Sequence, residues 1–175
     1  IALLTSFLNT MVYTPLKKIT WLNTSIGSIP GALPIIGGWT ASTGTIGPMA
    51  WILFGMMYLW QHPHFYSIAW MCREDYADAK LKMLPVIDPG GNSTMRQIFW
   101  HLLLMIPVSI IPVVQGYLGN IYLIGVVVLT SAFFMSALPL AREKSNKNAL
   151  LLLKASVFYL PILLLIIIID LGVAI

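Results

Sequence analysis

Long apolar runs separated by short polar stretches dominate the sequence. The hydrocarbon core of a bilayer is about 30 Å thick, so a membrane-spanning helix needs about 20 mainly apolar residues. Six runs meet or approach this length, and none alternates between apolar and polar residues as the strands of a membrane barrel do. We therefore predict an all-α protein, a multi-span bundle of transmembrane helices. The predicted helices lie at about 1–16, 22–41, 46–72, 97–117, 119–141 and 149–170.

The composition supports a membrane protein. Of the 175 residues, 58% are hydrophobic and 9% are charged, whereas about a quarter of an average soluble domain is charged. The net charge of +4 does not indicate a nucleic-acid partner, because the basic residues form no stripe along a polar face. The sequence begins at Ile1 inside an apolar run, so we expect residues 1–175 to belong to one transmembrane domain with a further N-terminal part. The pattern does not indicate an oligomeric state.

Charged residues are confined to three of the junctions between predicted helices. Except for Asp170, every Asp, Glu, Lys and Arg lies after the first, third or fifth predicted helix, or near the start of the next. These junctions are two membrane crossings apart, so they lie on the same side of the bilayer. Lys and Arg are enriched in cytoplasmic loops, which predicts that this side faces the cytoplasm of a bacterial inner membrane, or alternatively the matrix of a mitochondrion. Asp170 is expected at the opposite interface.

The second predicted helix is rich in glycine and proline. Gly27 and Gly31 are four residues apart, a spacing that lets two helix backbones approach closely. Pro30 and Pro34 each lack a backbone N–H and are expected to bend the helix. The pattern predicts a kinked helix that packs tightly against its neighbours.

Acidic and basic residues on the charged side are candidate ligands for a metal ion and a diphosphate. Asp75 and Asp78 share one face of a helix, where Mg²⁺ would relieve their mutual repulsion. Lys17 and Lys18 can neutralise a phosphate. Acidic helix ends and lysine anchors are also common at membrane surfaces, so each feature alone has an ordinary explanation. Their common side of the membrane favours a diphosphate with Mg²⁺ held between Lys17, Lys18 and Asp75.

Two histidines form a second polar group, about ten residues before the acidic segment. His62 and His64 flank Pro63, which disfavours a regular helix there, and their spacing fits no zinc motif. Either histidine is a candidate to ligate iron, to bond a carboxylate of a ligand, or to satisfy a partner within the bundle. His101 has no comparable neighbours in the sequence, so we expect it to be structural.

Aromatic residues near the charged side form a third group. Aromatic faces stabilise carbocations by cation–π attraction, and aromatic residues also form the belts found at membrane interfaces. The group consists of Tyr13, Trp60, Phe65, Tyr66, Trp70 and Tyr76.

Four segments together resemble a known family. The segments "YTPLKK", "NTSIGSIPGALPIIGGW", "WQHPHF" and "REDYADAKLKMLPV" are closely similar to the haem O synthases, or protohaem IX farnesyltransferases, of the UbiA-type intramembrane prenyltransferase superfamily. The resemblance covers essentially the whole chain in order. Residues 13–86 carry its most specific part and separate this family from its quinone and chlorophyll relatives.

The resemblance implies a fold and an activity. The fold would be a bundle of nine spans, of which residues 1–175 supply the last six, within a single transmembrane prenyltransferase domain. The activity would be transfer of a farnesyl group from farnesyl diphosphate to a vinyl group of haem b, which makes haem O for terminal oxidase assembly. The implied partners are farnesyl diphosphate, haem b and the lipid bilayer, with Mg²⁺ as cofactor of the diphosphate.

The resemblance also assigns roles to residues. Asp75 stands in the family's second aspartate motif, and Lys17 and Lys18 stand for its basic diphosphate-binding pair. His62 and His64 match residues suspected of holding haem. Tyr13, Thr14 and Asn23 stand in the matching polar positions nearby, and Arg73 and Tyr76 are also expected to contact ligands. Asp78 is not a dependable family position, and its expected place beside Asp75 at the metal rests on the helical spacing alone.

The sequence departs from the family at several positions. The family's first aspartate-rich motif is expected upstream of Ile1, so residues 1–175 alone are expected to be inactive. Lys18 stands where arginine is usual, which keeps the charge but not the bidentate geometry. Lys80 and Lys82 replace the glycine and proline that commonly follow the acidic motif, so the local turn is expected to differ.

Two other functions remain open from the sequence. One is a prenyltransferase that acts on an aromatic quinone precursor. The other is a transporter or a non-enzymatic assembly subunit, for which bent, glycine-rich spans are also suitable, although no repeated half is evident in the six predicted spans.

Overall fold

The computed structural model describes residues 1–173, which form helices joined by short connections, with no strand in that range. The all-α prediction is therefore confirmed. Each of the six predicted runs becomes a helical unit, and the first unit consists of three helical segments in succession. The elements are α1 (Ala2–Phe7), the π-helix η1 (Leu8–Tyr13), α2 (Thr14–Ile19), α3 (Asn23–Thr43), α4 (Pro48–Met71), α5 (Arg73–Asp78), α6 (Leu84–Ile87), α7 (Asn92–Val114), α8 (Asn120–Arg142) and α9 (Asn146–Val173).

Three helices within residues 1–173 are long and apolar enough to cross a membrane, judged by length and composition: α7, α8 and α9. The helices α3 and α4 have similar lengths but lower hydropathy. Glycine, proline, serine and threonine lower it in α3, and tryptophan, tyrosine, histidine and glutamine lower it in α4. The helices α4, which carries His62 and His64, and α3, which begins at Asn23, are therefore the least hydrophobic of the long helices.

The helix α7 begins five residues before its predicted start at residue 97. The Asp88 carboxylate accepts hydrogen bonds from the Thr94 N–H at 2.9 Å and from the Thr94 hydroxyl at 3.3 Å. A carboxylate in this position satisfies a free N–H at a helix start and complements the positive end of the helix dipole. The polar residues from Asn92 onward are therefore helical.

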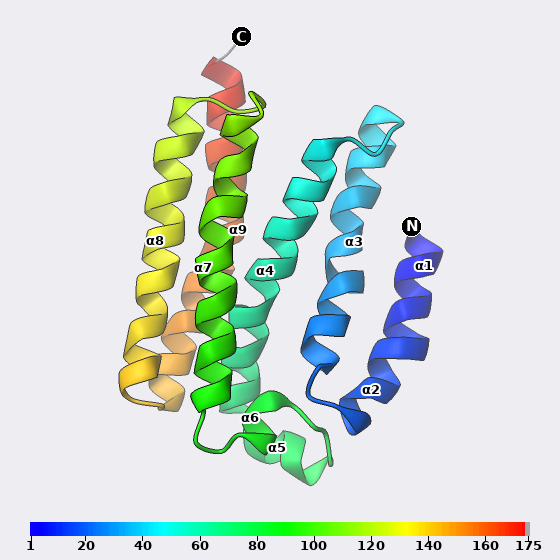
Figure 1. Ribbon diagram of the computed structural model, residues 1–175, viewed down its shortest axis with the longest axis vertical. Helices are drawn as coiled ribbons and strands as arrows, with labels where there is room; N and C mark the ends of the chain where they lie inside the picture. The colour runs from blue at the N-terminus through cyan, green and yellow to red at the C-terminus, as the bar shows by residue number, and fades with distance from the viewer. Residues whose placement is uncertain (174–175) are drawn as a thin grey trace.

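The long helices pack side by side, with α4 in the middle (Figure 1). The helices α7, α8 and α9 form a group on one side of α4, and α3 lies on the other side, between α4 and α1. The short helices α2, α5 and α6 lie together at one end of the bundle, near the starts of α7 and α9 (Figure 1). This end carries the charged junctions of the chain.

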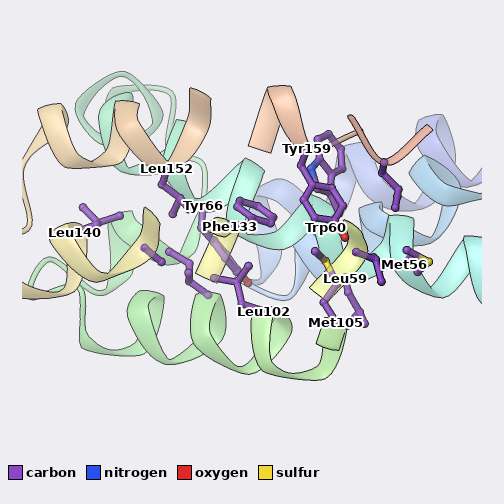
Figure 2. Packing of buried hydrophobic residues seen from close by; sticks show 14 of the residues in the cluster. Met56, Leu59, Trp60, Tyr66, Leu102, Met105, Phe133, Leu140, Leu152 and Tyr159 are labelled. Atoms are coloured by element: carbon purple, nitrogen blue, oxygen red, sulfur yellow. The ribbon is translucent and has the colours of Figure 1, made fainter. Parts of the chain in front are cut away.

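Large apolar side chains from α4, α7, α8 and α9 fill the space between these helices (Figure 2). Several polar groups within this core are paired across helices. The Trp60 indole N–H donates to the Ser156 carbonyl at 2.9 Å, and the Tyr122 hydroxyl donates to the Ser109 carbonyl at 2.9 Å. Such pairing lowers the cost of burying these groups in an apolar interior, where an unpaired polar group is costly.

The prediction that Pro63 interrupts the helix is wrong. The helix α4 runs without a break from Pro48 to Met71, so His62 and His64 lie on one regular helix. Membrane helices tolerate proline because neighbouring helices and side chains compensate for the lost backbone hydrogen bond. The side chains of His62 and His64 consequently project from α4 in different directions.

Candidate functional site

The basic pair and the acidic segment lie at the same end of the bundle, as the charge pattern predicts. Lys17 and Lys18 are in the last turn of α2, and Asp75 and Asp78 are on α5 (Figure 1). The chain that leaves α5 passes alongside α2, where the Lys82 N–H donates a hydrogen bond to the Lys17 carbonyl at 2.7 Å. The two segments are thus in direct backbone contact.

Asn23 reinforces this contact from the first residue of α3. Its side chain is completely buried, and its Nδ2 donates to the Thr20 carbonyl at 2.7 Å and to the Lys82 carbonyl at 3.0 Å. The Thr24 hydroxyl donates to the Asn23 Oδ1 at 3.3 Å. The carboxamide predicted to contact a ligand is therefore engaged within the fold.

Tyr13 lies under Lys17. The Lys17 Nζ is 4.4 Å from the centroid of the Tyr13 ring, within cation–π range. The ring lies against Gly27 so closely that a Cβ at this position would overlap it. The small residue at position 27 therefore admits the aromatic side chain, and the aromatic side chain supports the ammonium group of Lys17. Lys18 is exposed beside it.

The two candidate metal-binding carboxylates on α5 face water. Asp75 and Asp78 are both exposed, and no group of three or more His, Cys, Asp or Glu side chains within residues 1–173 converges so as to hold a metal ion. Tyr76, between them, is partly buried. Burial, followed by electrostatic interaction with the neighbouring Cys72 and Asp75 side chains, raises the pKa of the Tyr76 phenol above its ordinary value. Tyr76 is therefore a neutral hydroxyl at physiological pH.

Two other residues predicted to contact ligands have partners within the chain. The Thr14 hydroxyl donates to the Asn9 carbonyl at 2.9 Å. The Arg73 guanidinium donates to the Trp70 carbonyl at 3.0 Å and to the Asn146 Oδ1 at 3.2 Å, and lies 5.1 Å from the Trp70 ring centroid. Arg73 is thus held toward the start of α9, and a ligand contact for either residue remains a prediction.

His62 is completely buried and both of its ring nitrogens are engaged. Its Nδ1 is 2.9 Å from the Tyr58 carbonyl, which only accepts, so the proton lies on Nδ1. Its Nε2 is 3.3 Å from the Ser25 hydroxyl, which therefore donates to it. The ring is stacked on that of His101, with centroids 3.5 Å apart and an interplanar angle of 12°.

His64 has a different environment on the same helix. Its Nδ1 is 2.8 Å from the Ser156 Oγ, and the single hydroxyl proton of Ser156 is already donated to the Leu153 carbonyl at 2.6 Å. The Nδ1 of His64 is therefore the donor, and Nε2 carries a lone pair that no group within residues 1–173 engages. The ring is partly exposed and stacks on Trp60, with centroids 4.8 Å apart.

Nothing in the sequence indicates that His101 would join this group. The Nδ1 of His101 lies 2.7 Å from the Gln97 carbonyl, and its ring covers one face of His62. His101 and His62 are far apart in the chain, and no sequence motif links the two.

Gly31 and Gln61 are likewise far apart in the chain but in contact in the structure. The Gln61 side chain occupies the space that a Cβ at position 31 would need.

An apolar cavity of about 450 Å³ lies in the half of the bundle away from the charged end. Residues of α3, α4 and α9 line it, among them Ile35, Met57 and Leu163. Ile35 is about 18 Å along α3 from Asn23, at 1.5 Å per residue. The cavity suits hydrocarbon and is too far from the lysines to hold a diphosphate.

Comparisons with known proteins agree with this arrangement. The family model described as "UbiA prenyltransferase family" matches residues 1–166. A protoheme IX farnesyltransferase of Solibacter usitatus is 45% identical over 152 residues, which are 87% of this chain and 52% of that protein. The protoheme IX farnesyltransferase of Salinibacter ruber is 46% identical over 159 residues, 91% of this chain and 56% of that protein. The chain thus spans about half the length of these curated relatives.

A solved structure shares the fold. It is described as "Structural and mechanistic insights into the biosynthesis of Digeranylgeranylglyceryl phosphate synthase in membranes". The match has a TM-score of 0.72 and 19% sequence identity, and covers 95% of this chain and 57% of that chain. At this identity the likeness concerns the arrangement of the helices alone.

Proposed function

Because the chain belongs to the UbiA prenyltransferase family, we propose that the protein is an intramembrane prenyltransferase that transfers a farnesyl group from farnesyl diphosphate to a vinyl group of haem b, making haem O. The names of the relatives from Solibacter usitatus and Salinibacter ruber support haem as acceptor and farnesyl as donor. The observation that carries the proposal is the backbone contact between Lys17 and the segment that follows Asp75.

The charged end binds the diphosphate. Breaking the allylic carbon–oxygen bond leaves negative charge on the diphosphate, and the ammonium groups of Lys17 and Lys18 stabilise this charge. Asp75 and Asp78 fit a share of a Mg²⁺ site, because Mg²⁺ commonly takes one or two carboxylates and completes its shell with phosphate oxygens and water. Bound Mg²⁺ supplies further positive charge to the departing diphosphate.

The apolar bundle protects the allylic cation. Water would quench this cation, and the helices around α4 present mainly apolar side chains to the interior. Tyr13, which lies under Lys17, offers an aromatic face close to the leaving group. The same wall of aromatic and aliphatic side chains suits the farnesyl tail.

His64 is the better candidate of the two predicted histidines to meet haem. Its Nε2 lone pair is free and its ring is partly exposed, whereas both nitrogens of His62 have partners inside the bundle. An imidazole whose Nδ1–H is fixed by a hydrogen bond presents Nε2 as a ligand. His62 then serves to hold α4 against α3 and α7.

The charged end faces the cytoplasm in this proposal. Lys17, Lys18, Lys80 and Lys82 lie at that end, and positively charged loops are retained on the cytoplasmic side. The protein would reside in a bacterial inner membrane, since the relatives named above come from bacteria.

The test is a product assay with the full-length protein. The purified protein is incubated with haem b, farnesyl diphosphate and Mg²⁺, and the product is analysed by mass spectrometry for addition of a farnesyl group. Asp75→Asn should abolish the product while the protein stays in the membrane, and Glu74→Gln, an equally exposed neighbour, should retain it. Prenylation of an aromatic quinone precursor with no reaction on haem would show that the acceptor is wrong.

A further inference from the structure

Two hydrogen bonds join the corner between α2 and α3 to the segment that follows α5, and a third lies within the corner. The Lys82 N–H donates to the Lys17 carbonyl at 2.7 Å, and the Asn23 carboxamide donates to the Lys82 carbonyl at 3.0 Å and, within the corner, to the Thr20 carbonyl at 2.7 Å. The two bonds made by Lys82 connect residues that are about sixty positions apart in the chain. We refer to Lys17, Thr20, Asn23 and Lys82 as the clasp.

We propose that the clasp sets the position of the diphosphate-binding lysines relative to the acidic segment, and that Asn23 is a positioning residue and not a ligand contact. This inference rests on the function proposed above. Asn23 is completely buried, both protons of its carboxamide are donated, and its Oδ1 accepts from the Thr24 hydroxyl. Neither amide proton remains available to donate to a substrate phosphate.

The clasp is needed because neither group is held firmly by its own helix. Lys17 is in the last turn of α2, at the end of a helical stretch that runs on from α1 and η1, and Asp75 is on α5, which has six residues. Helix ends fray and a helix as short as α5 is not stable by itself, so the orientation of both groups depends on tertiary contacts. A diphosphate with its metal ion must meet both groups at once, and the clasp is the connection that joins their segments directly.

The turn after α5 brings Lys82 to the clasp. A proline at position 82 would lack the N–H that Lys82 donates to Lys17. The preceding Lys80 has a left-handed backbone with φ of 56°, and the Leu81 N–H returns to the Tyr76 carbonyl at 2.9 Å. This tight turn at the end of α5 directs the chain back toward α2.

The sharpest test compares Lys82→Pro with Lys82→Ala in the full-length protein. Both variants remove the side-chain charge, but only proline removes the N–H. The KM for farnesyl diphosphate should be about fivefold higher in Lys82→Pro than in Lys82→Ala, the effect of one neutral hydrogen bond, with the KM for haem b the same in both. Equal KM values for farnesyl diphosphate would overturn the proposal.

Asn23→Asp provides the second test, because it keeps the shape of the side chain and loses the amide donors. The KM for farnesyl diphosphate should rise at least about tenfold, as expected for two lost hydrogen bonds. The control is Thr130→Val, which removes the buried hydrogen bond to the Tyr159 hydroxyl between α8 and α9. If Thr130→Val raises this KM as much as Asn23→Asp, the effect is general destabilisation and the clasp has no positioning role.

Assays of the wild-type protein distinguish failure of the clasp proposal from failure of the proposed function. Farnesyl transfer by the wild type with no difference between the Lys82 variants contradicts the clasp alone. Absence of both farnesyl transfer and binding of Mg²⁺–pyrophosphate in the wild type, measured by calorimetry, contradicts the proposed function and the clasp with it.

Discussion

The Asp170 carboxylate near the end of α9 accepts a hydrogen bond of 2.6 Å from the Gly119 N–H, immediately before α8. Its other oxygen accepts from the Tyr122 N–H at 3.0 Å. Asp170 is at the uncharged end of the bundle, as expected from the sequence, but it is only 5% exposed. A buried carboxylate in this position satisfies two free N–H groups at the start of α8 and complements its dipole.

Asp170→Ala should therefore lower the free energy of unfolding by about 2–4 kcal/mol, because two backbone N–H groups lose a charged acceptor. Thermal unfolding of the protein in detergent measures this effect. Leu171→Ala is the matched control, since Leu171 is the next residue and is 47% exposed. If the two variants unfold at the same temperature, the Asp170 carboxylate does not hold α8 to α9.

The helical fold followed from the apolar runs because hydrocarbon allows few alternatives. Water is absent from the bilayer core, so backbone polar groups must be satisfied within each segment. Each of the six predicted helices accordingly has a counterpart in the structure, and the errors concern ends such as Asn92, where Asp88 extends α7, and the expected interruption at Pro63. Counting membrane crossings also predicted that Lys17 and Asp75 lie at the same end of the bundle, where α2 and α5 are found (Figure 1).

The side-chain environments could not be read from the sequence in the same way. His62 and His64 look equivalent in "WQHPHF", yet a regular helix turns one toward Ser25 and His101 and the other toward Ser156. These partners lie on three other helices, and only the packing of those helices decides which histidine keeps a free nitrogen.

Lys80→Gly should stabilise the protein. Lys80 has a φ of 56°, in the left-handed region where a side chain clashes with its own backbone. Glycine adopts this conformation without that penalty, so the gain should be about 1 kcal/mol, reduced somewhat by the greater freedom of glycine in the unfolded chain. Unfolding in detergent measures the change. Lys80→Ala keeps the strain and serves as the control, and an equal gain in both variants would mean that the lysine side chain, not its backbone, is unfavourable.

Gly27→Ala should impair transfer by displacing Tyr13. The added methyl group would overlap the Tyr13 ring, which supports the Lys17 ammonium group. We expect activity to fall about tenfold, equivalent to 1.4 kcal/mol, mainly through a higher KM for farnesyl diphosphate. Gly38→Ala is the control on the same helix, because nothing lies within 4 Å of a Cβ at that position. Equal activities of the two variants would mean that the position of Tyr13 does not affect the function of Lys17.

His64→Ala should weaken haem binding at least about tenfold, a loss of 1.4 kcal/mol or more, while His62→Ala should mainly reduce stability. The reason is the free Nε2 of His64 and the engaged nitrogens of His62. Absorption spectra recorded while haem b is added to the full-length protein measure the affinity. Free imidazole should restore the spectrum of His64→Ala if His64 ligates the iron, and should have no effect if His64 bonds a haem carboxylate. Unchanged affinity in His64→Ala together with a lost spectrum in His62→Ala would reverse the assignment and would require the stack on His101 to open when haem binds.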